Sequence, residues 1–453
     1  MEQMTIREIA HVLGVPHGTD GEVTSLCTDS REAQEGSLFV AICGENTDGH
    51  RYIASALERG AVCALAQEPG DYPPEKVLRV ENTLEALLAI GAHYRSKFPV
   101  RVVGITGSVG KTTTKDMVAA VAQAAFCTVK TQGNQNNEIG MPKTLLTLDH
   151  TTQVAVVEMG MSGPGEIRAL ARAARPHMGV ITNIGVSHLE HLGTRENILR
   201  AKLELAECLP DGAPLFLCKD NDLLATVDIP RLRVQFYSLE DPGCPLYGEI
   251  TRSDTGETCV AIHWQGGVYP VKLPGIGRHL ALNALAAFGV GQELGIPPGD
   301  CVRALEGYTP SGMRQRMTRH HGVTVVEDCY NASPDSMAAA IAAAAEYPAP
   351  GRKLLVLSDM LELGDIARQS HREVGALAAR AGLDALLAWG PLSAEYVRGA
   401  EEADMGDTRY YEEKEELMAD LVRMARPGDL IWVKGSHGMK LEEVIRYFYQ
   451  HYN

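Results

Sequence analysis

Short apolar runs alternate with stretches of helical periodicity along most of the chain, which is typical of an α/β protein. In the central part, apolar runs at 100–105, 154–157 and 180–181 predict strands, and polar residues follow each run. Strands that alternate with helices form a doubly wound parallel sheet, whose ligands bind at the carboxyl ends of the strands. The pattern therefore predicts ligand-binding residues at these strand ends.

The residues before this sheet predict a small α/β unit. Helices are expected over 5–14 and 52–57, and strands over 37–42 and 61–66. The unit also contains two polar segments, at 28–31 and 44–50. For both segments the residue types fit ordinary turns and a binding site equally well.

The pattern changes after the central strands. Residues 233–273 alternate apolar and polar positions between Gly and Asp turns, which predicts a small antiparallel appendage. Helical periodicity returns at 279–294, and 309–312 is expected to be a linker. Beyond it, an Ala-rich helix is expected over 336–345. A second α/β sheet is predicted from apolar runs at 323–326, 354–357, 386–389 and 430–433.

The length of 453 residues fits about three domains. We expect them over 1–82, 83–309 and 310–453, with a helix over 83–96 opening the second. The net charge of −16 argues against broad contact with nucleic acid or an anionic membrane.

The ten cysteines form no C-x-x-C pair, so neither a zinc site nor a disulfide framework is indicated. A basic-then-apolar leader is absent, and no apolar run approaches the roughly 18 residues of a membrane span. We therefore expect a cytoplasmic protein without stable membrane insertion.

Residues 104–115, Gly-Ile-Thr-Gly-Ser-Val-Gly-Lys-Thr-Thr-Thr-Lys, predict a nucleotide site rather than a glycine-rich turn beside an incidental lysine. A strand, a glycine-rich turn and a helix N-terminus direct backbone N–H groups towards a polyphosphate. Lys111 is expected to reach the β- and γ-phosphates, and Thr112 to offer its hydroxyl to Mg²⁺. Ile105 stands where the general pattern has glycine, so the loop is a variant. The expected nucleotide-binding residues are Thr106, Gly107, Ser108, Val109, Gly110, Lys111 and Thr112.

Glu158 and His188 follow the next strands and fit a metal site. Glu158 closes an apolar run, where a carboxylate is costly unless it is paired or binds a cation, and Mg²⁺ is the expected cation beside a P-loop. The spacing of His188 and His191 excludes a zincin motif. The alternatives are a sheet-edge glutamate in solvent and two surface histidines.

Lys202 lies in the apolar arc of a helix that Thr194 can cap. At about 100° per residue it falls between Ile198 and Leu199, so it must extend to solvent, pair, or lose its charge. The pattern alone favours extension to solvent. A lysine with a depressed pKa can also react with CO₂ to give a carbamate, which is an anion that binds metals.

The loop 133–140 contains more side-chain amides than a simple turn requires. Asn and Gln side chains suit sugar, amide and phosphate contacts, although an ordinary polar loop is also consistent with this composition.

With these residues in hand, the chain resembles the Mur ligases nearly from end to end. The segments that carry the resemblance are 30–31, 38–41, 48–50, 106–112, 133–142, 158–160, 182–184, His188, 201–202, 277–279, Asn283, 328–332, 359–364, His371 and 434–436. The Tyr-Asn-Ala segment at 330–332 and Asp-Met-Leu-Glu-Leu-Gly at 359–364 are similar to those of the member that adds D-alanyl-D-alanine to UDP-N-acetylmuramoyl-tripeptide.

The resemblance implies an N-terminal domain that binds the UDP substrate, a central ATPase and a Rossmann-like C-terminal domain. It implies that Lys111 and Thr112 hold ATP and Mg²⁺, that Glu158 and His188 serve the metal sites, and that Lys202 is a carbamylated metal ligand. Nucleotide contacts are expected from Asn283, Arg314 and Asp328. Substrate contacts are expected from Ser30, Arg31, Asn134, Asn137, Tyr330 and Asn331. We expect a monomer that binds no nucleic acid.

Three positions depart from the family pattern, namely Leu280, Ser333 and His437. The last two stand where the family has an asparagine and an arginine, which leaves the dipeptide contacts open.

An amide ligase of this kind activates a carboxylate as an acyl phosphate, which an amine then attacks. The nearest alternatives are the Mur enzyme that adds the third residue, and folylpolyglutamate synthase. A P-loop switch protein is disfavoured because the chain has no Asn-Lys-x-Asp motif. A homologue that only binds nucleotide is disfavoured because Lys111, Glu158 and Lys202 are all present.

Overall fold

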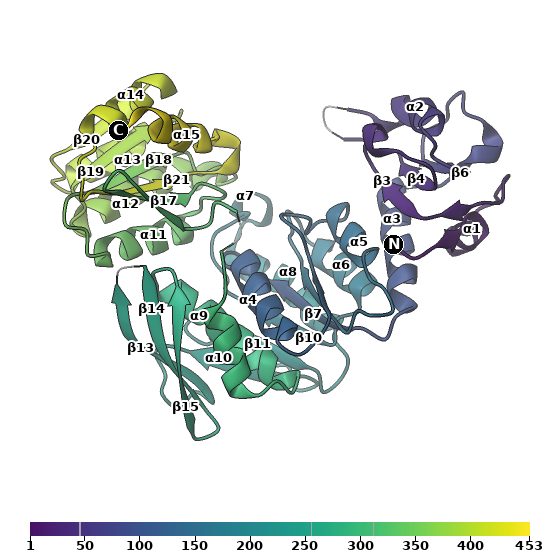
Figure 1. The fold of residues 1–453 in the computed structure, drawn as a ribbon, viewed down its shortest axis with the longest axis horizontal. Coiled ribbons are helices and arrows are strands. Elements are labelled where there is room, and N and C mark those ends of the chain that lie inside the picture. The colour runs from purple at the N-terminus through teal and green to yellow at the C-terminus, as the bar shows by residue number, and fades with distance from the viewer. Residues whose placement is uncertain (45–46, 255, 311) are drawn as a thin grey trace. The chain divides into compact units, whose positions relative to one another are not determined.

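The computed structural model describes residues 1–44, 47–254, 256–310 and 312–453 (Figure 1). It is a mixed α/β protein whose larger sheets consist mostly of parallel strands, which confirms the predicted fold class. Glu45, Asn46, Thr255 and Ser311, which belong to an expected polar segment, the expected appendage and the expected linker, lie outside the described residues. The domain boundaries after residues 82 and 309 stay predictions.

The chain clusters into two compact units, which are 1–106 with 126–179 and 203–213, and 107–125 with 180–202 and 214–453. Each unit is described by itself below. Among the described residues, no helix combines the length and the apolar character that crossing a membrane requires.

The N-terminal residues form a parallel sheet in the order β3-β4-β5-β6 beside a short antiparallel pair. Its elements are β1 (Met4–Thr5), α1 (Ile6–Leu13), β2 (Glu22–Val23), β3 (Ser25–Cys27), β4 (Ser37–Val40), α2 (Ile53–Glu58), β5 (Cys63–Ala66) and β6 (Val77–Arg79). The Thr5 side chain caps α1, and Gly14 closes it at φ 67°. This left-handed conformation favours glycine, so the predicted helix end is confirmed.

The central sheet has the order β15-β14-β13-β12-β11-β10-β7-β9-β8. Its strands are β7 (Arg101–Thr106), β8 (Thr128–Lys130), β9 (Val154–Glu158), β10 (Met178–Ile181), β11 (Pro214–Cys218), β12 (Arg233–Ser238), β13 (Leu246–Asp254), β14 (Glu257–Trp264) and β15 (Gly267–Pro274). β7 pairs with β9 in parallel, as the strand–helix alternation predicts.

The prediction of an antiparallel appendage is confirmed only for β13, β14 and β15, which Figure 1 shows side by side. β12 pairs in parallel with both β11 and β13. The region therefore continues the central sheet, because the edge of β11 accepts β12 in the same direction before the hairpins begin.

The helices of this region are α3 (Thr83–Ser96), α4 (Lys111–Gln123), α5 (Gly140–Leu145), α6 (Glu166–Ala174), α7 (Leu189–Leu192), α8 (Arg195–Glu207), α9 (Arg278–Glu293) and α10 (Pro298–Glu306). The predicted cap of α8 is confirmed, since the Asn197 N–H donates to Thr194 Oγ1 over 3.2 Å. α10 was not predicted from the apolar pattern.

The last sheet has the order β16-β17-β21-β18-β19-β20, and all neighbours except β16 and β17 are parallel. Its strands are β16 (Arg316–His320), β17 (Val323–Asp328), β18 (Lys353–Ser358), β19 (Ala385–Trp389), β20 (Thr408–Tyr411) and β21 (Leu430–Lys434). Its helices are α11 (Pro334–Glu346), α12 (Ala367–Arg380), α13 (Ala394–Glu402), α14 (Lys414–Met424) and α15 (Glu442–His451).

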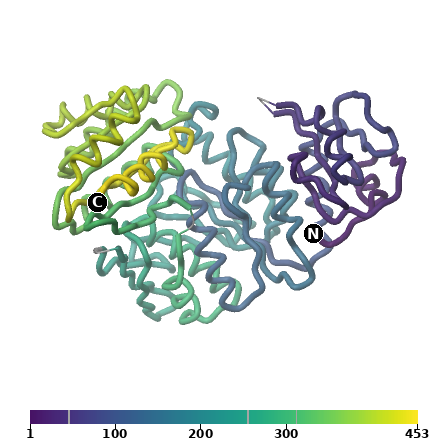
Figure 2. Tube along the Cα trace, turned by 45° about the horizontal axis from the view of Figure 1, so that its top comes forward, coloured from purple at the N-terminus to yellow at the C-terminus, as the bar shows by residue number. Residues whose placement is uncertain are grey.

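Two apolar cores cover the opposite faces of this sheet. One contains residues of α11, α12 and α13, and the other contains residues of α14 and α15. Figure 2 shows the C-terminal helix, in yellow, among the yellow-green segments of this same part of the chain. Helices on both faces explain why β18, β19 and β21 read as apolar runs without alternation.

Candidate functional site

The P-loop has the strand–turn–helix layout that its sequence predicts. β7 ends at Thr106, and α4 begins at Lys111 after Gly110 at φ 85°. Gly107 has φ 148°, and a Cβ there would lie 1.9 Å from Thr182 Oγ1, so the position requires glycine. Lys111 Nζ donates to the carbonyl oxygens of Gly107 and Ser108 over 2.9 and 3.3 Å. The lysine therefore lies against the loop whose ligand it is expected to bind.

Asn183, which follows β10, holds the P-loop in place. Its carbonyl oxygen accepts the Ser108 N–H over 3.0 Å, and its Oδ1 accepts the Val109 N–H over 2.8 Å. Ser108 Oγ in turn accepts the Gly185 N–H over 2.9 Å. The sequence places Asn183 at a strand end but does not assign it this role.

Glu158 is 1% exposed at the end of β9 and lies opposite Ile105 of β7 in the register of the two strands. The interpretation as a solvent-exposed glutamate is therefore wrong. Its Oε1 accepts a hydrogen bond from Asn136 Nδ2 over 2.8 Å, and its N–H donates to Thr131 Oγ1 over 3.0 Å. Because β9 lies between β7 and β8, the carboxylate is enclosed at the carboxyl end of β9, between two neighbouring strands.

Lys202 is 1% exposed, so the prediction that it extends to solvent is wrong. Burial, followed by the charge of Lys111, holds the pKa of the Lys202 amine well below its ordinary value. Lys202 is buried because it lies in the apolar arc of α8, where its side chain cannot reach water. The amine is therefore neutral over a wider range of pH than an exposed lysine.

His188 is also not a surface residue, because its side chain is 21% exposed, whereas His191 is exposed. Burial, followed by the charges of Lys111 and Lys202, lowers the pKa of His188 to about 4. The structure thus brings Lys111, His188 and Lys202 together. Because the charge of Lys111 lowers the pKa of both His188 and Lys202, an anion such as a polyphosphate would be stabilised beside these groups.

Asn283 of α9 adjoins this loop, and its contact with the nucleotide stays a prediction. It is 6% exposed, and its Oδ1 accepts a hydrogen bond from Thr114 Oγ1 of α4 over 3.1 Å. A Cβ at Gly110 would lie 2.8 Å from the same oxygen.

Asp328 closes β17 and accepts hydrogen bonds from Lys434 Nζ over 2.9 Å and Trp432 Nε1 over 3.4 Å. Lys434 Nζ also donates to the Asn331 carbonyl over 3.0 Å. The Arg314 guanidinium lies 4.1 Å from the centre of the Tyr330 ring. The residues expected to act from the last sheet thus form one linked group.

A cavity joins this group to His188. Tyr330 stacks with His437, with ring centres 5.5 Å apart, at one part of its wall. The residues that line it are Ser187, His188, Tyr330, Asn331, Ala332, Ser333, Leu361, Glu362, Leu363, Ser436, His437 and Gly438. Two of the positions that depart from the family pattern, Ser333 and His437, therefore face the same cavity.

The remaining expected substrate contacts lie in the other unit. Ser30 is buried, while the exposed Arg31 pairs with Asp29 at 2.5 Å and thereby lowers the pKa of that carboxyl to about 2. Asn134 and Asn137 are exposed on the amide-rich loop, and Asn137 Oδ1 accepts the Gly140 N–H over 2.9 Å.

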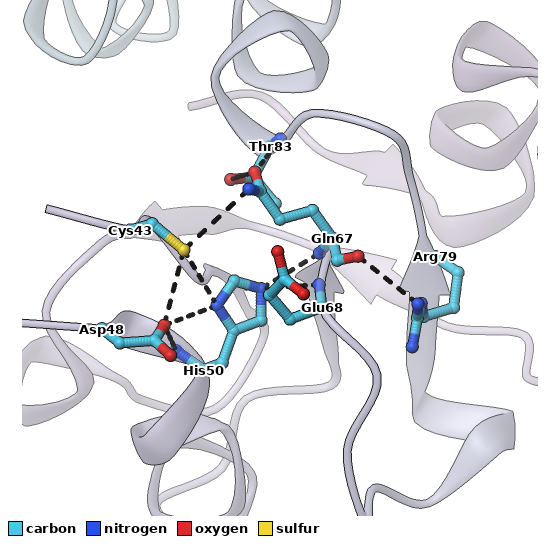
Figure 3. Close-up of polar contacts among 7 residues, drawn as sticks. All are labelled: Cys43, Asp48, His50, Gln67, Glu68, Arg79 and Thr83. Carbon is cyan, nitrogen blue, oxygen red and sulfur yellow. Dashed lines mark hydrogen bonds and ion pairs between the residues drawn. The ribbon is translucent and has the colours of Figure 1, made fainter.

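Asp48 and His50 of the polar segment at 44–50 form a cluster with the preceding Cys43, and the potential ligand atoms of the three residues lie within 4.8 Å of one another (Figure 3). His50 Nε2 accepts the N–H groups of Gln67 and Glu68 over 3.0 and 3.2 Å. The imidazole proton is therefore on Nδ1, which donates to Asp48 Oδ1 over 2.7 Å. Because Nδ1 then has no lone pair for a metal, the cluster favours the interpretation as a structural turn.

Three family descriptions match the chain. "Mur ligase family, catalytic domain" matches residues 22–95, "Mur ligase middle domain" matches 105–291, and "Mur ligase, glutamate ligase domain" matches 313–437.

Relatives match over nearly the whole chain. A Bacillus subtilis protein named UDP-N-acetylmuramoyl-tripeptide–D-alanyl-D-alanine ligase is 37% identical, over 98% of each chain. The crystal structure of MurF from Acinetobacter baumannii covers 99% of each chain with a TM-score of 0.91 and 28% identity. The MurF ligase of Thermotoga maritima in complex with ADP covers 94% of this chain and 97% of its own, with a TM-score of 0.85 and 28% identity.

Proposed function

Because the chain belongs to the Mur ligase family, we propose that it is an ATP-dependent ligase that joins D-alanyl-D-alanine to UDP-N-acetylmuramoyl-tripeptide, with release of ADP and phosphate. The product is the pentapeptide precursor of peptidoglycan. The observation that carries the proposal is the basic group of Lys111, Lys202 and His188 beside a P-loop, in a chain whose relatives have this name.

ATP is the nucleotide. The P-loop N–H groups, the N-terminus of α4 and Lys111 supply the positive field that γ-phosphoryl transfer requires. The substrate carboxylate attacks the γ-phosphorus, the bond to ADP breaks, and an acyl phosphate results. The amine of the dipeptide then attacks the acyl carbon, and phosphate and a proton leave.

The residues present fit Mg²⁺. Thr112 and Glu158 are buried oxygen donors, and His188 is a buried imidazole whose pKa of about 4 keeps it neutral. These residues would hold the ion, which neutralises phosphate charge when bound. Burying a carboxylate such as Glu158, which is 1% exposed, is costly unless a cation or hydrogen bonds compensate for it, and a bound Mg²⁺ would do so.

The surroundings of Lys202 fit carbamylation. Reaction with CO₂ forms an N–C bond and releases a proton, and it requires the neutral amine that burial favours. Carbamylation turns Lys202 from a basic group into an anion, which removes its repulsion with Lys111. The carbamate would then be a further metal ligand.

For the substrates, we propose that Tyr330 and Asn331 contact the dipeptide in the cavity that they line. Ser30, Arg31, Asn134 and Asn137 would contact the UDP substrate, and Asn283, Arg314 and Asp328 the nucleotide. We further propose three domains, over 1–82, 83–309 and 310–453, in a monomer that acts in the cytoplasm.

The test is phosphate release from ATP with UDP-N-acetylmuramoyl-tripeptide, measured with and without D-alanyl-D-alanine. Release that requires both substrates and yields the pentapeptide is expected. Release without either substrate, or with glutamate and a folate instead, would overturn the proposal.

A further inference from the structure

Arg314 and Tyr330 are neighbours because the antiparallel pair of β16 and β17 brings their segments together. The residues just before β16 and those just after β17 lie at the same end of this pair. There the Sγ of the buried Cys329 lies 3.5 Å from Met313 Sδ. The next residue of each segment continues the contact, because the Arg314 guanidinium lies 4.1 Å from the centre of the Tyr330 ring.

The loop that carries Tyr330 is held in place by one buried lysine. Lys434 Nζ donates to Asp328 Oδ2 over 2.9 Å and to the Asn331 carbonyl over 3.0 Å. These two acceptors flank Tyr330 in the sequence, so the backbone on both sides of the ring is fixed. The ring also stacks with His437, with ring centres 5.5 Å apart. Tyr330 is therefore held by its own loop and by a neighbouring ring.

The Arg314 side chain has no comparable polar anchor. It is half-buried, and in the described part of the chain its guanidinium makes no hydrogen bond or ion pair with another side chain. A cation within about 6 Å of a ring centre is attracted by the negative face of the ring. This contact uses none of the five N–H donors of the guanidinium, which all stay available to an anion. The Tyr330 ring therefore restricts the position of an arginine whose donors are unused.

We propose that Tyr330 is a positioning residue for Arg314, whose guanidinium it holds by a cation–π contact for binding to the nucleotide. Holding a side chain in its bound position raises affinity, because less conformational freedom is lost when the ligand binds. This inference rests on the proposed function in one respect, which is that Arg314 contacts the nucleotide. Its tests need no peptide substrate, so it can fail while the ligase assignment stands.

The first test observes the contact itself in the full-length protein, by NMR of ¹⁵N-labelled arginine side chains. The ring current of Tyr330 shifts the proton signals of a guanidinium above its face to lower frequency, and the spectrum of Arg314→Lys assigns the Arg314 signal. Tyr330→Phe keeps the ring and should keep the shift, whereas Tyr330→Leu should abolish it. Tyr410→Leu, at an exposed position of β20, is the matched control and should leave the Arg314 signal unchanged.

The second test measures the affinity of a non-hydrolysable ATP analogue by isothermal titration. Tyr330→Leu is expected to weaken binding by about 3- to 10-fold, which is the effect of losing one cation–π contact. Tyr330→Phe should bind the analogue like the wild-type protein. Because Tyr330 acts through Arg314, the double variant of Tyr330→Leu and Arg314→Ala should bind no more weakly than Arg314→Ala alone.

Four results would each overturn the positioning role. They are an Arg314 signal without a ring-current shift in the wild-type protein, wild-type affinity in Tyr330→Leu, additive losses in the double variant, and a loss in Tyr330→Phe equal to that in Tyr330→Leu. The last result would assign the effect to the phenol hydroxyl rather than to the ring face. Wild-type protein that binds no analogue would instead contradict the proposed function.

Discussion

The side-chain amide of Asn136 donates to Glu158 Oε1 over 2.8 Å, at the carboxyl end of β9. A backbone hydrogen bond joins the same two segments, because the Gly160 N–H donates to the Asn136 carbonyl over 2.8 Å. The amide-rich loop is therefore attached to the strand that carries the buried carboxylate. Asn136 orients one oxygen of Glu158, and this leaves the carboxylate with a fixed direction.

We expect Asn136→Ala to weaken Mg²⁺ and nucleotide binding and to destabilise the fold by about 1–3 kcal/mol, because it removes a hydrogen bond to a buried charge. Asn136→Asp should be worse, since it places a second carboxylate against Glu158. Metal-dependent nucleotide affinity and urea denaturation measure the two effects. Gln132→Ala, on the same stretch but exposed, is the control. Unchanged metal affinity in both Asn136 variants would contradict the orienting role.

Asn183→Ala is expected to loosen the P-loop. It removes the acceptor of the Val109 N–H, and an unpaired buried donor costs about 1–3 kcal/mol. We expect ATP affinity to fall by about 10-fold, which corresponds to about 1.4 kcal/mol. Isothermal titration with an ATP analogue gives the affinity. Asn197→Ala loses a comparable hydrogen bond to the Leu192 carbonyl, away from the P-loop, and should bind the analogue normally.

A pH effect is expected at the start of the P-loop strand. His177 Nδ1 accepts the Val102 N–H over 3.0 Å, and burial, followed by Arg95 and Arg101, lowers the His177 pKa below its ordinary 6.5. Protonation removes this acceptor. The unfolded chain takes up the proton first, so the stability that His177 contributes is complete above pH 6.5 and is lost as pH falls through the lower folded value.

His177→Asn offers a similarly placed oxygen acceptor that does not titrate. Its unfolding free energy should therefore depend less on pH between 4.5 and 7, about the range in which histidine titrates, than that of the wild-type protein. Denaturant titrations across this range measure the difference. Equal slopes for the two proteins would show that other groups determine the pH dependence.

The sequence predicts those parts of the site that local chemistry determines. The P-loop, Glu158 and the misplaced Lys202 are recognisable because each residue type is improbable in its own local pattern. Asn136 was not singled out, since several amides share the loop and only the folded loop shows that Asn136 is the one that contacts Glu158. The parallel pairing of β12 with β11 and β13 was also missed, because strand pairing depends on contacts between residues that are distant in the sequence.

Lys202 links the stability of the protein to its activity. A buried amine without its charge still lacks the packing of an apolar side chain, so Lys202→Met is expected to unfold at the same or a higher denaturant concentration than the unliganded wild-type protein. It should nevertheless lose ligase activity, since it can form no carbamate. Urea denaturation and phosphate release measure the two properties, and a stable but inactive variant is the expected combination.

Lys202→Ala tests the carbamate itself, because it leaves space for an added anion. Ligase activity should be lost and then recover in part with short-chain carboxylates, which replace the carbamate as an anionic metal ligand. Wild-type protein prepared with ¹³C-bicarbonate should give a carbamate signal that Lys202→Ala lacks. Arg200→Ala, at an exposed position of the same helix, should keep both activity and signal. Full activity of Lys202→Ala without added carboxylate would exclude a catalytic carbamate at this position.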